Sequence, residues 1–138
     1  MVFETENYKS LIEQVVISFY SKAVNDIFIG YHFRKLIPDK RDQVIIYENL
    51  GHFSGHIPKI VDFWSEQLLN DYKSTRDKEN LLKSHETLNI RKGELGRWLV
   101  LFRKTLQEEL SDKDFIDHWN KKVDQFELAF NRYFFSHT

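Results

Sequence analysis

The chain of 138 residues contains no cysteine, only 2 prolines and only 5 glycines. The lack of cysteine excludes disulfides, thiolate metal sites and cysteine nucleophiles. Because glycine and proline are scarce and apolar residues mostly recur at three- and four-residue spacing, we predict an all-α fold without paired strands. No apolar run is long enough to cross a membrane, and the N-terminus lacks the character of a signal peptide, so we expect a soluble cytoplasmic protein.

The chain also lacks an excess of charge of one sign. It has 20 basic and 21 acidic residues, interspersed, for a formal net charge of −1. Such a distribution provides no electrostatic footprint for nucleic acid or for an anionic membrane, and we expect neither as a partner. With no break in composition, residues 1–138 are predicted to form a single domain that is large enough to enclose a small-molecule pocket.

Aromatic residues are abundant, with 12 Phe, 6 Tyr and 3 Trp making 15% of the chain. A small helical core is readily filled by leucine and isoleucine, so this content is more than packing alone requires. Flat pocket walls for a flat ligand would explain it, with ordinary aromatic core packing as the alternative.

Apolar spacing and turn residues predict the helical segments. Pro58 is tolerated because it falls in a first turn, and Ser111 with Asp114 is typical of a capping box at the start of the last helix. Residues 70–80 are expected to form a polar connection. The helices are predicted near residues 7–25, 31–36, 40–52, 56–69, 78–87, 93–110 and 112–136.

His85 is the most informative residue of the sequence. Leu81, His85 and Leu88 stand at i, i+4 and i+7, which places the imidazole on the inward face of its helix. A neutral imidazole held in one tautomer, here by the backbone oxygen of Leu81, is a ligand for heme iron. The alternative is a core histidine that is satisfied by a backbone carbonyl.

A second inward histidine, His56, begins the segment that carries Ile60, Phe63 and Trp64 at i+4, i+7 and i+8. It therefore shares the apolar face of that helix, with the same core alternative. His52 lies four residues earlier in the sequence, a spacing that also suits a pair of zinc ligands, but no third ligand is evident. The remaining histidines are expected at the surface or at helix caps: His32, His118 and His137.

Tyr20 and Trp98 each combine an apolar body with one hydrogen-bond donor. Beside a heme, either donor would contribute about 1.5–3 kcal/mol to holding a partly anionic gas ligand. The alternative for each is core packing with the polar tip reaching solvent.

Taken together, these segments resemble the truncated hemoglobins, and most closely their third group. The spacing from His85 to Trp98 and the block after it are the specific part, and the resemblance covers nearly the whole chain. The matching pieces are Phe19-Tyr20, Phe33, His56-Ile57-Pro58 leading to Asp62-Phe63-Trp64 and Leu68-Leu69, His85 with Leu88 and Ile90, and Arg97-Trp98-Leu99-Val100-Leu101-Phe102-Arg103.

The resemblance implies a truncated globin fold, a two-on-two helical sandwich around heme b (iron protoporphyrin IX). His85 then corresponds to the proximal ligand of a five-coordinate iron, with Tyr20, His56 and Trp98 on the distal side. The residues that correspond to heme contacts are Phe33, His56, Ile60, Phe63, Leu81, His85, Leu88, Ile90, Leu95 and Trp98.

The function that follows is the binding of oxygen or another diatomic ligand, such as nitric oxide or carbon monoxide. One alternative is a heme-dependent redox enzyme that acts on nitric oxide, nitrite or peroxide, as a nitric oxide dioxygenase or a peroxidase-like enzyme does. Because the chain has no flavin or nucleotide motif, any reductase would be a separate protein. A second alternative is a heme-free helical interaction or regulatory module.

Overall fold

The computed structural model describes residues 3–34, 57–73 and 90–135, and within these ranges every regular element is a helix. This confirms the all-α prediction for the described part of the chain. The predicted helices near 40–52 and 78–87 lie outside it. None of the described helices is long and apolar enough to cross a membrane. The helices are α1 (Thr5–Ala23), α2 (Gly30–Arg34), α3 (Ile57–Leu68), α5 (Lys92–Glu109) and α6 (Lys113–Phe135).

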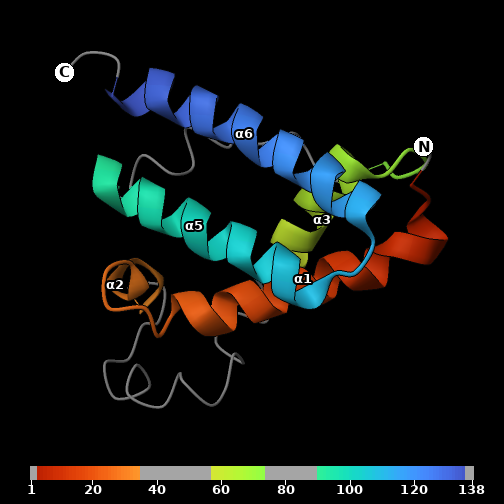
Figure 1. The fold of residues 1–138 in the computed structure, drawn as a ribbon, viewed down its shortest axis with the longest axis horizontal. Coiled ribbons are helices and arrows are strands. Elements are labelled where there is room, and N and C mark those ends of the chain that lie inside the picture. Colours follow the sequence, from red (N-terminus) through yellow and green to blue (C-terminus); the bar gives the residue numbers. More distant parts are fainter. Residues whose placement is uncertain (1–2, 35–56, 74–89, 136–138) are drawn as a thin grey trace.

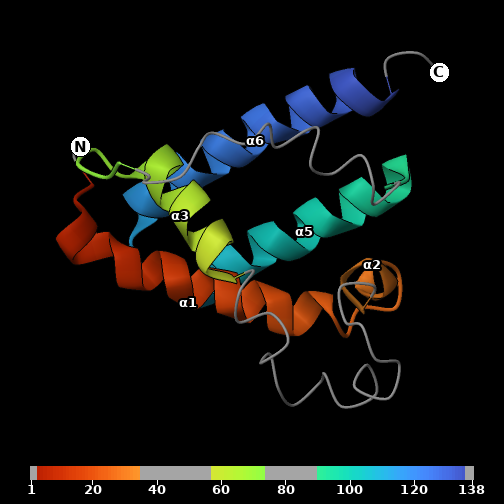
Figure 2. The same ribbon diagram turned by 180° about the vertical axis from the view of Figure 1, so that it is seen from behind.

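The four longer helices contact one another in the order α1–α5–α6–α3 and back to α1. Helices α5 and α6 form an antiparallel pair, in which Arg103 of α5 binds Asp124 of α6 at 2.6 Å. Helix α1 runs antiparallel to α5, since Gln14 reaches Glu109 at 2.9 Å, near the end of α5. Figure 1 shows α1 below the α5–α6 pair. Figure 2, seen from behind, shows α3 in front, between α1 and α6. The short α2 follows α1 and lies beside the start of α5 (Figure 1).

The core is centred on Trp119 of α6, which is fully buried. Its ring centroid lies 5.4 Å from that of Trp64 on α3 and 5.6 Å from that of Phe102 on α5. Phe115, also fully buried, is 5.8 Å away on α6 itself. Ring pairs at these distances add to the hydrophobic gain from area burial. Much of the aromatic excess is therefore core packing, which was the alternative reading of the composition.

The buried face of α1 follows the helical repeat. Ile12, Val15, Val16, Phe19 and Tyr20 are all buried, as the spacing of three and four residues predicts. The predicted ends of the four longer helices agree with the observed ones to within about two residues, the usual uncertainty of helix ends.

The start of α6 corrects one prediction. The capping residue is Asp112, whose Oδ1 accepts the backbone N–H groups of Asp114 at 3.1 Å and Phe115 at 3.2 Å. The other carboxylate oxygen accepts the hydroxyl of Tyr8 at 2.9 Å. A capping box at Ser111 was therefore wrong by one residue, because the carboxylate satisfies the first-turn amides while also binding α1.

Candidate functional site

The two predicted distal donors come from different helices, and both rings lie near Phe19, which precedes Tyr20 on α1. Tyr20 of α1 has its ring centroid 6.0 Å from that of Phe19, and Trp98 of α5 stacks near Phe19 at 6.3 Å with an interplanar angle of 25°. Tyr20 is buried and Trp98 is half-buried against the core. Burial raises the pKa of the Tyr20 phenol well above its ordinary value, so the hydroxyl keeps its proton.

The described residues that were predicted as pocket walls lie on α3 and α5. Ile60 is half-buried against the core, and Phe63 packs against Phe126 of α6 at a centroid distance of 5.4 Å. Leu95 is buried, and so is Phe130 of α6, yet neither belongs to the main core cluster. Phe63, Leu95 and Phe130 thus add apolar surface of α3, α5 and α6 outside the main core cluster.

The other predicted site residues cannot be placed with the donors. Ile90 is half-buried just before α5, and Phe33 lies in α2, where only its backbone is described. In the described part of the chain, no three histidine, aspartate or glutamate side chains form a metal-binding group. Four predicted site residues lie outside the described ranges, and the predicted iron ligand, His85, is one of them. The other three are His56, Leu81 and Leu88.

Glu94, near the start of α5, binds three groups that the sequence reading did not connect to it. Its Oε2 accepts the Tyr31 hydroxyl and contacts His32 Nε2 at 3.1 Å, and its Oε1 accepts the backbone N–H of Arg91 at 2.9 Å. Burial on its own raises the pKa of Glu94, but the hydrogen bonds from Tyr31, Arg91 and His32 outweigh it, so the pKa is lowered. Glu94 is thus a carboxylate that holds α2 against α5.

His32 was expected at the surface or at a cap, and this was wrong because its side chain is only 2% exposed. Since the Glu94 carboxylate accepts, Nε2 carries the proton of this contact. The other ring nitrogen, Nδ1, has no hydrogen-bond partner among the described residues. A five-residue helix has too little periodicity to reveal which side faces inward, which is why the sequence did not place His32.

A second carboxylate joins the same two regions. Asp26, in the corner between α1 and α2, accepts from Arg97 Nε at 2.9 Å and Nη2 at 2.6 Å. Its other oxygen accepts the backbone N–H groups of Phe28 at 2.9 Å and Ile29 at 3.2 Å. Burial raises the pKa of Asp26, but these hydrogen bonds lower it by more, so the side chain is a buried carboxylate.

His118, also expected at the surface or at a cap, is half-buried. Its Nε2 lies 3.0 Å from the backbone oxygen of Leu68 at the end of α3. Its ring stacks on Phe3 with a centroid distance of 4.8 Å and an interplanar angle of 19°. The residue therefore has a structural role that joins the N-terminus, α3 and α6.

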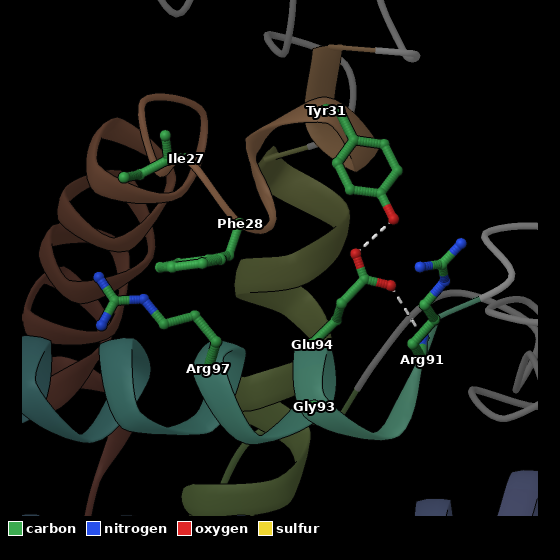
Figure 3. Close-up of a pocket in the computed structure, with 7 residues that line it drawn as sticks. All are labelled: Ile27, Phe28, Tyr31, Arg91, Gly93, Glu94 and Arg97. Carbon is green, nitrogen blue, oxygen red and sulfur yellow. Dashed lines mark hydrogen bonds between the residues drawn. The ribbon is translucent and has the colours of Figure 1, made fainter.

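Between the α1–α2 corner and the start of α5 lies a groove with a volume of about 860 Å³. In Figure 3 the Phe28 ring lies over the Arg97 side chain, and the Tyr31 hydroxyl points toward Glu94. None of the residues predicted to contact heme is among the described residues that line it. The groove is lined by Ile27, Phe28, Tyr31, Arg91, Gly93, Glu94 and Arg97.

Comparisons with protein-family models, with curated proteins and with solved structures find no match to this chain. A functional assignment therefore rests on the chain's own residues and their placement.

Proposed function

We propose that the protein is a heme-binding globin of the truncated type that takes a diatomic gas, with His85 as the iron ligand. The observation that carries the proposal is that Trp98 of α5 stacks near Phe19, the α1 neighbour of the buried Tyr20. A buried phenol and an indole each carry one hydrogen-bond donor, which suits a small, partly anionic ligand. The residues match those that the sequence resemblance assigns to the distal side.

The described residues that the resemblance assigns to the heme walls are apolar, as contact with a heme requires. Phe63, Leu95 and Trp98 are aromatic or aliphatic and lie on α3 and α5, and Phe126 extends the apolar surface to α6. The buried position of Leu95 outside the main core is what a second apolar compartment requires. Heme iron, when bound, supplies a coordination position for a gas ligand.

The helix arrangement also supports the proposal. Helices α1 and α3 contact each other, α5 and α6 form an antiparallel pair, and α1 packs against α5. Two pairs of helices packed on each other agree with the two-on-two sandwich that the resemblance implies. In this proposal, Tyr20 holds its proton at Oη because burial raises its pKa, so the hydroxyl remains a donor.

The test is an absorption spectrum of the purified protein with stoichiometric hemin, recorded oxidised, reduced and under carbon monoxide. We expect a sharp Soret band that shifts on reduction and again with carbon monoxide. His85→Ala should abolish tight hemin binding or the normal ligation, whereas His137→Ala should leave the spectra unchanged. A wild-type spectrum identical to that of free hemin would overturn the proposal and favour a heme-free helical module.

A further inference from the structure

Around the groove between α2 and α5, the acidic side chains are more buried than the basic ones. The two acidic side chains are nearly covered, with Asp26 4% exposed and Glu94 13% exposed. The Arg97 side chain is 40% exposed, and Arg91 is an exposed residue. The acids face their protein partners, so the groove presents positive charge to solvent.

The groove also has exposed apolar side chains. Ile27 is 87% exposed and Phe28 is 61% exposed, a large cost for residues of this type unless something covers them. Tyr31 stands on the other side of the groove from Phe28 (Figure 3). The Arg97 guanidinium lies 6.0 Å from the centre of the Phe28 ring, which orients that ring.

Gly93 lines the groove on α5. A Cβ atom placed on Gly93 would have no protein atom within 4 Å, so the space above this position is open. The absence of a side chain at Gly93 lets a flat group come close to the helix backbone.

We propose that this groove is a binding site for a small aromatic carboxylate. The ring of the ligand enters between Phe28 and Tyr31 above Gly93, and its carboxylate pairs with the Arg91 guanidinium. Asp26 already neutralises Arg97. Glu94 contacts Arg91 only at its backbone N–H, so the Arg91 guanidinium, which forms no salt bridge within the described ranges, is left for a ligand with a single negative charge. The volume of about 860 Å³ is in the range of small-molecule sites.

This site is independent of the proposed heme function. The described residues that line the groove do not include those assigned to the iron or to the distal donors. A ligand here contacts the α1–α2 corner and the start of α5.

Phenylacetate is a suitable probe, with its neutral analogue phenylacetamide as the comparison. Each is titrated into the isotope-labelled full chain, while NMR follows the Ile27 methyl group and the Gly93 amide. We expect saturable shifts at both positions with phenylacetate. The amide should bind about tenfold more weakly or worse, because it cannot form the charge-assisted pair.

Three variants test the assigned contacts. Arg91→Gln should weaken phenylacetate binding about tenfold, while the backbone N–H that binds Glu94 is kept. Gly93→Leu should abolish binding by filling the groove. Gly96→Leu is its matched control, because it lies on the same helix, also has no atom within 4 Å of an added Cβ, and is not among the lining residues.

The proposal predicts that wild type and Gly96→Leu bind alike and that Arg91→Gln and Gly93→Leu do not. It is overturned if phenylacetate causes no saturable shift at Ile27 and Gly93. It is also overturned if acid and amide bind equally, or if Gly93→Leu binds as well as Gly96→Leu.

Discussion

Arg97 of α5 binds a single carboxylate oxygen of Asp26 through two nitrogens, Nε at 2.9 Å and Nη2 at 2.6 Å. The pair links positions 71 residues apart and joins the α1–α2 corner to α5. The Asp26 side chain is 4% exposed, so removal of the guanidinium leaves a buried carboxylate without its counter-ion.

We therefore expect Arg97→Gln to lower the free energy of unfolding by about 1–3 kcal/mol, a range reduced for the half-exposed arginine. Urea denaturation at neutral pH measures the change. Lys22→Gln is the matched control, because Lys22 of α1 also pairs with α5, through Glu108 at 2.5 Å, but the Glu108 side chain is 43% exposed. The control should lose less than about 1 kcal/mol. Equal losses in the two variants would contradict a special role for the Asp26–Arg97 pair.

The same carboxylate predicts acid sensitivity. Hydrogen bonds hold the pKa of Asp26 in the folded chain below its ordinary value, so the unfolded chain takes up the proton first as the pH falls. The contribution of Asp26 to stability is present above about pH 4 and is lost as the pH drops through the folded-state pKa. Urea denaturation of wild type and Asp26→Asn should give a difference at pH 7 that shrinks toward pH 3. A difference that does not depend on pH would refute this account, and Asp117→Asn at an exposed position is the control.

Trp119 tests the aromatic core. It is 0% exposed and contacts rings of α3, α5 and its own helix. Trp119→Ala should cost about 3–5 kcal/mol of unfolding free energy, because it removes buried area and leaves a cavity. Leu128→Ala, on the exposed side of the same helix, should change stability by less than about 0.5 kcal/mol. Chemical denaturation of both variants decides whether the core is centred where the structure places it.

The donors of the proposed gas site have their own test. If Tyr20 and Trp98 donate to a gas ligand, Tyr20→Phe and Trp98→Phe in the heme-loaded protein should each speed oxygen dissociation, by roughly tenfold or more for a donor worth about 1.5 kcal/mol. Stopped-flow displacement of oxygen by carbon monoxide measures the rate. Tyr133→Phe, at an exposed position of α6, should leave it unchanged. Unchanged rates in the first two variants would mean that neither donor reaches the ligand.

Local pattern accounts for the helices. The spacing of apolar residues depends on the helical repeat alone, so it located α1, α3, α5 and α6. The predicted N-cap of α6 was one residue too early, because Ser111 and Asp112 are both suitable N-cap residues. The contact between Asp112 and Tyr8 of α1 cannot be predicted from the residues next to Asp112 in the sequence.

The candidate sites also combine features that the sequence determined with contacts that only the tertiary structure decided. The sequence by itself determined the longer helical segments, and its resemblance to a known family singled out Tyr20 and Trp98 as a pair. Only the tertiary structure decided that Trp98 stacks near Phe19, that His32 is buried against Glu94, and that Asp26 and Arg97 pair. The physical reason is separation along the chain. Helical periodicity reaches a few residues, whereas these contacts span more than sixty and depend on how α5 packs against α1 and α2.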